Sequence, residues 1–316
     1  MSIIYHMENT KKRTLVIGGS GFIGTHTVNS LLDQDHQVGV ISRSIGIHNN
    51  VEYYCGNILD EDFLSQSISD FDPNFVIHLA GSKNRSIQID DFKSDINTNL
   101  NGTLNIFGCL ISLKSLEQVI VVGSTEEYGD AESVPFVESM NETPISSYSF
   151  SKTCTKYLAE TFARVYGLPV AYVRPSIAYG PRQNPDMFIS SLCTTLLKGE
   201  RFQMSSGEQR RDFIYIDDLV ELFMAIINFN SPVTGTFNAG GGSSVQIKKI
   251  AMMIADKLSS ESLIDIGHIK TRALESDEHL LDNSKASSLL NWNPTTSLEE
   301  GISKTVEFFS KSTHEE

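Results

Sequence analysis

From Thr14 onward, short and wholly apolar runs alternate with segments of helical periodicity, and this alternation constrains the fold more than any other feature. Apolar runs without a polar face predict strands buried on both sides, with helices as the cover. Right-handed crossovers then give an α/β fold with a doubly wound parallel sheet. The predicted strands cover residues 14–18, 37–42, 51–56, 75–81, 118–124 and 168–175, and the helices cover 25–35, 96–113, 147–166 and a segment from about 60.

A glycine-rich turn, GGSGFIG (18–24), joins the first apolar run to the first helix. Gly18 and Gly21 permit a tight turn and close approach of the backbone to a pyrophosphate, while Gly24 lets the helix pack closely on the strand. The helix N-terminus adds N–H donors and positive dipole. The bare GxxGxxG pattern is weak evidence, but its place after the first strand of a βαβ series favours a Rossmann-type dinucleotide-binding site.

The rhythm of strands and helices breaks after Tyr179. A helix near 187–197, a polar stretch, and finally short helices and loops follow, while GTFNAGGG (235–242) can return a strand to the sheet. We predict a dinucleotide-binding domain at 12–180 with a returning segment near 212–242. A smaller, mainly C-terminal substrate-binding cap is predicted at 181–211 and 243–312, and a loose N-terminal tail at 1–11.

Composition excludes several classes of protein. The 316 residues are 40% hydrophobic and 20% charged, which is typical of a globular chain of about two domains. The 25 Lys and Arg residues oppose 39 Asp and Glu residues, and the net charge of −14 disfavours nucleic-acid partners. A small anionic ligand remains compatible with this charge, because a few buried cations and backbone N–H groups outweigh it locally.

The cysteines and the apolar segments indicate where the protein resides. Cys55, Cys109, Cys154 and Cys193 form no CxxC pair, so we expect no metal site and no redox motif. The segment MSIIYHMENTKKR lacks the apolar core of a signal peptide, and no apolar run is long enough to span a membrane. We therefore expect a soluble cytoplasmic protein without membrane association.

The end of the second strand indicates which dinucleotide binds. An acidic residue there would hold the ribose hydroxyls of NAD, but the chain has Ser42 and Arg43, which suit a 2′-phosphate. Asp60, after the third strand, is predicted to begin a helix and not to replace the missing acid. We predict NADP(H), with NAD(H) as the alternative if Arg43 is only a solvated surface arginine.

Tyr148 and Lys152 in YSFSK are spaced i,i+4 and so share one helix face. A tyrosine with an ordinary pKa near 10 is a poor acid–base catalyst at neutral pH, and a nearby ammonium is expected to lower that pKa. A lone YxxxK match is commonly a solvated helix face. Here the helix follows the fifth strand, and Ser124 lies at the C-terminal end of that strand, where ligands of open α/β sheets bind.

Nine motifs in order resemble the extended short-chain dehydrogenases/reductases, which include NAD(P)-dependent nucleotide-sugar epimerases, dehydratases and reductases. The similarity spans Thr14 to about Phe309. The motifs are GGSGFIG (18–24), HLAG (78–81), NLNGTLN (99–105), GSTEEYG (123–129), YSFSK (148–152), RPSIAYGPRQ (174–183), RRDFIYIDD (210–218), FNAGGG (237–242) and LDNSKA (281–286).

The resemblance implies Tyr148 as the catalytic acid/base, Lys152 on the nicotinamide ribose, and Ser124 on the reacting sugar oxygen. It also implies a nucleotide-diphosphate sugar between sheet and cap, and a homodimer formed through two helices per subunit. Further cofactor-binding positions are Phe22, Ile23, Asn57, Ile58, Leu79, Ala80, Gly81 and Asn99. The substrate-binding positions are Thr125, Glu126, Arg182, Arg211 and His279.

Four positions depart from the family pattern, of which the first, Ile17 in place of a frequent Thr before the first glycine, has little consequence. Asn57 stands where an Asp commonly accepts from the adenine amine, and an amide oxygen can do the same. Ile177 replaces a frequent Asn that helps to bind the sugar nucleotide, and His279 replaces a frequent Arg that faces its diphosphate. These changes leave Arg211 as the best candidate for the phosphate contact, unless it is only an exposed partner of Asp212.

The reaction is narrowed by Glu126 and by the cofactor. Glu126 resembles the carboxylate of 4,6-dehydratases and decarboxylases, although it is alternatively a structural hydrogen-bond acceptor, whereas GSTEEYG as a whole also resembles reductases of nucleotide-linked 4-keto-6-deoxyhexoses. A net reductase needs exchangeable NADPH, so we predict a 4-keto reductase. The alternatives are a 4,6-dehydratase or 4-epimerase with tightly bound NAD, and, remotely, a non-catalytic dinucleotide sensor.

Overall fold

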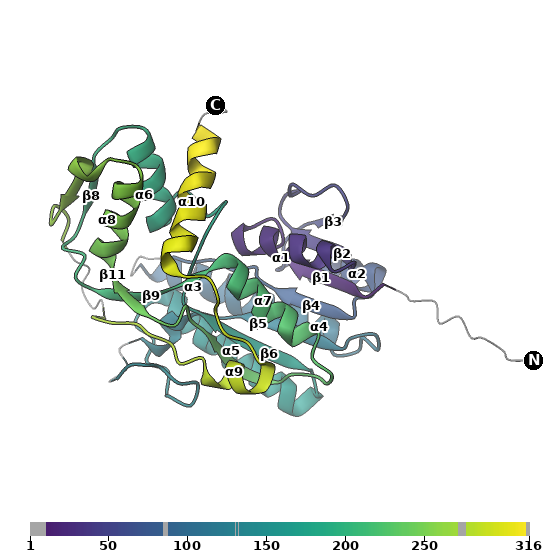
Figure 1. Cartoon of the computed structure of the whole chain (residues 1–316). Helices are drawn as coiled ribbons and strands as arrows, with labels where there is room; N and C mark the ends of the chain where they lie inside the picture. Colours follow the sequence, from purple (N-terminus) through teal and green to yellow (C-terminus); the bar gives the residue numbers. More distant parts are fainter. Residues whose placement is uncertain (1–10, 85–87, 130, 132, 271–275, 314–316) are drawn as a thin grey trace, which may run out of the picture.

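The computed structural model describes residues 11–84, 88–129, 131, 133–270 and 276–313, so nearly all of the predicted tail lies outside it. A seven-stranded sheet forms its centre, in the order β10-β6-β5-β4-β1-β2-β3, with every neighbouring pair parallel. The predicted doubly wound sheet is confirmed (Figure 1). Its strands are β1 (Arg13–Ile17), β2 (Gln37–Ser42), β3 (Glu52–Cys55), β4 (Phe75–His78), β5 (Gln118–Val122), β6 (Val170–Pro175) and β10 (Gly235–Ala239).

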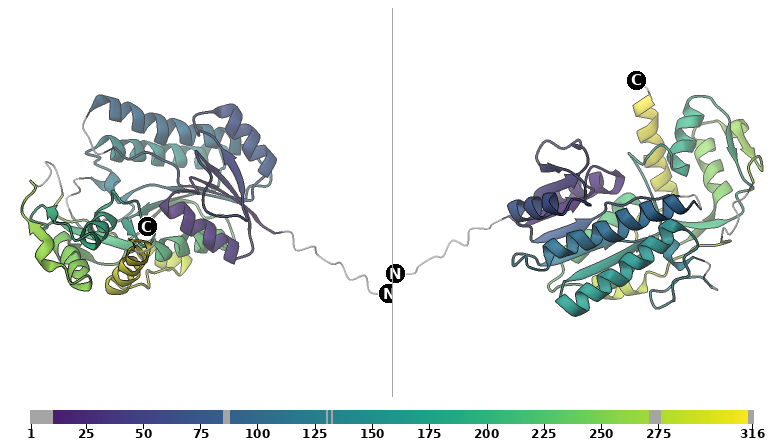
Figure 2. Two further views of the ribbon diagram at one scale, coloured as in Figure 1. Left: turned by 90° about the horizontal axis from the view of Figure 1, so that it is seen from above. Right: turned by 180° about the vertical axis from the view of Figure 1, so that it is seen from behind.

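Side chains of the central strands alternate between two apolar clusters, one on each face of the sheet. In β1, Val16 packs on the face covered by α1 (Phe22–Asp33) and α7 (Ile216–Ile227). Its neighbours Leu15 and Ile17 pack on the face covered by α2 (Glu61–Phe71), α4 (Gly102–Leu110) and α5 (Ser147–Tyr166). Figure 2 shows these two helical layers on opposite sides of the sheet. Burial on both faces explains why the strands are apolar throughout.

A smaller group of elements lies at one end of the molecule, away from β2 and β3 (Figure 1). Helices α6 (Phe188–Leu197), α8 (Ile247–Lys257) and α10 (Leu298–Thr313) pack on one another there. A three-stranded sheet joins β7 (Ile177–Tyr179), β9 (Arg210–Tyr215) and β11 (Ser244–Gln246), and a two-stranded sheet joins β8 (Phe202–Met204) and β12 (Ile264–Ile266). The short helix η3 (Glu261–Leu263) follows α8 in this group, whereas α9 (Ser284–Leu290) packs on β10 and α7 beside the central sheet.

The helix predicted at 96–113 differs from the observed one. It is preceded by α3 (Ile89–Asp95) and starts with a π-helical segment, η1 (Ile96–Asn101), before α4. Asn99 in η1 is buried, and its amide donates to the Ser82 carbonyl at 3.0 Å and to the Ser151 hydroxyl at 2.8 Å. These inward contacts accompany the local widening of the helix, and periodicity alone does not predict them. The polar stretch before β9 also contains β8, which was not predicted.

No helix in the described ranges combines the length and apolar composition that a bilayer crossing requires. Within the same ranges, no three His, Cys, Asp or Glu side chains are grouped so as to hold a metal ion. Asp60 caps α2, because its carboxylate accepts the Phe63 N–H at 3.0 Å, in keeping with the predicted helix start.

Candidate active site

The glycine-rich turn has the geometry of an anion-binding loop. Gly18 has a φ of +91°, which side chains disfavour. A Cβ on Gly24 would lie 2.4 Å from the Gly18 carbonyl oxygen, so only glycine allows α1 to start this close to the turn. Helix α1 begins at Phe22 with Gly21 as N-cap and without a side-chain cap or acidic first turn. The residues present therefore fit a dinucleotide pyrophosphate at the helix N-terminus.

The segment after β4 connects this turn to Lys152. The Ala80 N–H donates to the Ile17 carbonyl at 2.9 Å, as does that of Leu79 at 2.8 Å, and a Cβ on Gly18 would lie 2.7 Å from the Ala80 nitrogen. One residue further, a Cβ on Gly81 would lie 2.9 Å from Asn99 Oδ1 and 3.4 Å from Lys152 Nζ. The predicted cofactor positions thus form a continuous path from the turn to the lysine.

The residues predicted to bind the adenine end of the dinucleotide are partly buried in the structure and partly exposed. The Ser42 hydroxyl donates to the Ser44 carbonyl, whereas Arg43 is exposed. Asn57 is also exposed, and its amide oxygen accepts the Leu59 N–H at 3.1 Å. The Ile58 side chain is buried in the core beside Gly102, so only its backbone remains for a cofactor contact.

Three predicted catalytic residues meet at the junction of β5 and α5. Ser124 begins η2 (Thr125–Tyr128), where its side-chain oxygen accepts the Glu126 N–H at 3.1 Å. The Ser124 side chain also makes a hydrogen bond with Tyr148, near the start of α5. One turn further along α5, Lys152 is buried, and its ammonium donates to the Val122 carbonyl at 2.8 Å.

The expected lowering of the tyrosine pKa is wrong for this arrangement. Burial, followed by the charge of Glu126, raises the pKa of Tyr148 above its ordinary value. Burial also lowers the pKa of Lys152 to about 8, with Glu127 and Asp95 acting in the opposite direction. The Lys152 ammonium donates to a backbone carbonyl and not to the phenol. The charges that act on the Tyr148 pKa are those of Glu126, Glu127 and Asp95, and all three raise it.

Lys83 is a component of the site that the sequence reasoning missed. Its ammonium forms an ion pair with Glu126 and lies 4.9 Å from the ring centroid of Tyr148. Both charged side chains are about one-third exposed, with values of 35% and 36%. The available signal was its position two residues after HLAG, beyond the C-terminal end of β4, where ligands of parallel sheets bind.

The predicted substrate positions are only partly brought together. Arg211 is buried and close enough to His279 to lower its pKa, which burial has already shifted most, to about 4. The charges of Glu126 and Lys83 also act on His279, so these four side chains lie within reach of one another's charges. Arg182 lies elsewhere, 5.7 Å from the ring of Phe308 on α10 and close to His48 in the loop after β2.

Thr125 also provides an unsatisfied polar group. Its hydroxyl is buried and has no hydrogen-bond partner among the described residues.

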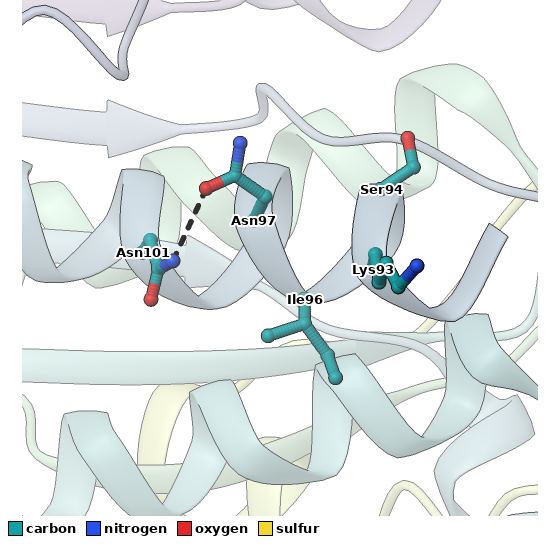
Figure 3. Close-up of a pocket in the computed structure, with 5 residues that line it drawn as sticks. All are labelled: Lys93, Ser94, Ile96, Asn97 and Asn101. Carbon is teal, nitrogen blue, oxygen red and sulfur yellow. Dashed lines mark hydrogen bonds between the residues drawn. The ribbon is translucent and has the colours of Figure 1, made fainter. Parts of the chain in front are cut away.

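A separate pocket lies on the surface of α3 and η1 and is lined by Lys93, Ser94, Ile96, Asn97 and Asn101 (Figure 3). None of these five was predicted as a site residue.

The fold and the Ser124–Tyr148–Lys152 site define a dinucleotide-dependent enzyme of the short-chain dehydrogenase/reductase type. The profile of the NAD dependent epimerase/dehydratase family matches residues 14–240. The chain therefore belongs to this family, in its extended group of nucleotide-sugar enzymes.

Relatives of known name cover almost the whole chain. A UDP-glucose 4-epimerase of Mycolicibacterium smegmatis is 29% identical over 94% of this chain and 98% of its own length. The crystal structure of UDP-glucose 4-epimerase from Thermotoga maritima with UDP-glucose has a TM-score of 0.88 at 30% identity, covering 95% of this chain and 99% of that one. MoeE5 in complex with UDP-glucuronic acid and NAD has a TM-score of 0.87 at 27% identity, with coverages of 95% and 99%.

Proposed function

We propose that the protein is an NADP(H)-dependent oxidoreductase that reduces the 4-keto group of a nucleotide-diphosphate-linked 6-deoxyhexose. The observation that carries the proposal is the contact between Ser124 and Tyr148, with Lys152 one helical turn away and adjacent to Gly81. A bound nicotinamide dinucleotide supplies the hydride. Tyr148 donates a proton to the sugar oxygen, and the Ser124 hydroxyl donates a hydrogen bond that stabilises the charge developing there.

The raised pKa of Tyr148 suits the reductive direction. An acid must be protonated before it acts, and burial keeps the phenol neutral at physiological pH. Lys152 lies next to Gly81, at the end of the segment that leads from the glycine-rich turn. We expect its ammonium to donate to the ribose and to stabilise negative charge on the phenol oxygen of Tyr148. We assign the diphosphate and sugar to Arg211 and Lys83, and the Thr125 hydroxyl, which has no partner among the described residues, adds a donor.

NADP(H) is favoured by the end of β2. Arg43 is exposed there, and residues 41–44 include no carboxylate that would repel a 2′-phosphate. We expect NADPH to bind at least about tenfold more tightly than NADH, and Arg43→Ala to abolish most of this difference. Equal affinities for the two cofactors in the unchanged protein would remove this part of the proposal.

A second candidate is a 4-epimerase or 4,6-dehydratase with resident NAD. Relatives and solved structures of the same fold are named as UDP-glucose 4-epimerases or hold NAD with a UDP-sugar. The carboxylate of Glu126, close enough to raise the Tyr148 pKa, also suits proton transfer at a neighbouring carbon. Cofactor that co-purifies, together with no net NADPH oxidation on a 4-keto-6-deoxy nucleotide sugar, would support this candidate and contradict the reductase.

The proposal includes a homodimer built from α4 and α5. These helices pack side by side on one face of the sheet (Figure 2), and large apolar side chains on them or at their ends are exposed. A cluster of apolar side chains is unfavourable when it is exposed to water, and such clusters typically mark a surface that binds another protein chain. The exposed side chains are Leu104, Ile111, Phe150, Tyr157, Val165 and Tyr166.

A further inference from the structure

A second glutamate, next to Glu126, occupies the opposite environment. Glu127 is 0% exposed, and it accepts the Ser124 backbone N–H at 2.7 Å. The Tyr172 hydroxyl lies 2.9 Å from its Oε1, and Arg174 Nε donates to its Oε2 at 2.8 Å. The Ser124 side chain in turn accepts a backbone N–H of η2. The two side chains therefore form a capping box that fixes the start of η2.

The same carboxylate is linked to the helix that bears Lys152. The Tyr172 hydroxyl lies 2.8 Å from the Lys152 carbonyl oxygen as well as near Glu127. The space for these groups depends on Gly123, where a Cβ would lie 2.3 Å from Glu127 Oε1 and 2.4 Å from the Tyr172 ring. One buried side chain thus connects the C-terminal end of β5, the strand β6 and the catalytic turn of α5.

Burial raises the pKa of Glu127, and its ion pair with Arg174 and its hydrogen bonds act in the opposite direction. Its partner Arg174 is also 0% exposed, lies 4.6 Å from the Tyr128 ring centroid, and donates to Glu142 as well. A buried ion pair is weak evidence for stability, because well-packed apolar residues of the same volume often serve equally well. A buried carboxylate at this position therefore calls for a role that an apolar side chain cannot perform.

The role is indicated by the charges around Lys152. The charged or titratable groups that act on it, or on which it acts, are Glu127 on η2, Asp95 at the end of α3, Lys83 after β4, and His78 on β4. Burial lowers the pKa of Lys152, and Glu127 is the largest of the opposing influences. Without Glu127, burial and the charge of Lys83 would lower the pKa of Lys152, and only the charge of Asp95 would raise it.

We propose that Glu127 is a positioning residue of the active site. Its carboxylate fixes the Ser124 backbone and, through Tyr172, the turn of α5 at Lys152, and it provides the negative charge that keeps the buried ammonium protonated. This inference rests on the proposed function only in taking Ser124 and Lys152 as working groups. Its test does not require the substrate to be known.

The test compares Glu127→Gln with Glu142→Gln. The second substitution removes the other carboxylate partner of Arg174, and Glu142 is not among the groups acting on Lys152. The Lys152 side chain is titrated by NMR on lysine-labelled protein and assigned with Lys152→Met. In Glu127→Gln we expect the Lys152 midpoint to fall by at least about one pH unit, the effect of losing a nearby opposite charge. In Glu142→Gln we expect it to stay in place.

Glu127→Asp separates charge from geometry and covers the case in which Glu127→Gln does not fold. The shorter carboxylate should leave the Lys152 midpoint close to that of the unchanged protein. It should also speed amide hydrogen exchange at Ser124, because the N–H loses its acceptor. Three results would overturn the proposal. The first is an unchanged Lys152 midpoint in Glu127→Gln, and the second is an equal shift in Glu127→Gln and Glu142→Gln. The third is a Lys152 midpoint in Glu127→Asp that lies a full pH unit below that of the unchanged protein. Failure of NADPH oxidation alone would contradict only the proposed reaction.

Discussion

Single residues of the active site differ in how far the sequence reveals them. Ser124, Tyr148 and Lys152 were predictable because each lies in a motif and at the end of a predicted strand or start of a helix. Glu126 and Glu127 are indistinguishable as a pattern, yet one pairs with Lys83 near the surface and the other is buried against Arg174. In a 3₁₀ turn successive side chains point about 120° apart, so only tertiary packing decides which glutamate faces inward.

The ionisation of Lys152 gives a prediction for pH dependence. Burial lowers its pKa to about 8, so the ammonium is lost as the pH rises through that value. Since a neutral amine neither attracts anions nor opposes charge on the phenol, we expect cofactor affinity to decline above pH 8. Fluorescence titration with NADH, which has no 2′-phosphate to titrate, measures this directly. An affinity that is flat across this range, or a decline that persists in Lys152→Met, would contradict the assignment.

The glycine-rich turn gives a second prediction. In Gly24→Ala the new methyl would lie 2.4 Å from the Gly18 carbonyl oxygen and 2.6 Å from the Gly19 Cα, and both are backbone atoms. We expect unfolding free energy to fall by about 1–3 kcal/mol and dinucleotide binding to weaken at least about tenfold. Gly108→Ala, on α4 with no atom within 4 Å of the added Cβ, is the matched control for dinucleotide binding, which it should leave unchanged; its stability is not compared, because Gly108 lies on the exposed side of α4 in the proposed dimer surface. Similar losses of dinucleotide binding in both variants would refute the steric argument.

At the level of elements, the parallel sheet and the helix near 187–197 were predictable, whereas the two small sheets were not. The strands of the sheet are continuous apolar runs because both of their faces are buried, as in β5, where all five residues are buried. The strands β7 and β11 have only three residues each, and the sheet they form with β9 is held by contacts between distant segments, such as the pairing of Val245 with Arg211. Local periodicity does not contain that information, because tertiary pairing decides it.

Asp212 on β9 shows how distant segments are tied together. Its buried carboxylate accepts the Gly241 N–H at 2.7 Å and the Leu281 N–H at 3.1 Å. Asp212→Asn replaces one acceptor oxygen with a donor, which leaves a buried N–H unpaired, so we expect a loss of about 1–3 kcal/mol in urea unfolding. Asp217→Asn, with its side chain 56% exposed, should change stability by less than about 0.5 kcal/mol. Equal effects would show that the Asp212 contacts are not specific.

For the whole molecule, the net charge of −14 is a poor guide to the ligand. The glycine-rich turn, Lys152, Arg211 and Lys83 bring N–H donors and cations to the proposed site, and Glu126, Glu127 and Asp95 lie close enough to act on Tyr148 there. The proposed dimer also belongs to this scale. The sequence resemblance implied two helices per subunit, and the exposed apolar side chains of α4 and α5 identify the surface that would pair.

The dimer prediction is tested on α5. Val165 has an exposed fraction of 63%, and Val165→Asp should shift the protein to the monomer, because an unpaired charge in an apolar interface is costly. Ile266→Asp, at another exposed apolar position (49%) on β12, should leave the mass unchanged. Light scattering after size-exclusion chromatography measures the mass. A monomer in the unchanged protein would exclude this assembly.

The most direct test of the central claim is the rate of NADPH oxidation on a 4-keto-6-deoxy nucleotide sugar, in the unchanged protein and in Tyr148→Phe. Loss of a positioned general acid lowers a rate by about 10²–10⁴-fold, and NADPH binding should be retained because the ring remains in place. The account predicts turnover in the first protein and a loss of this size in the second. Equal rates in the two proteins would contradict it.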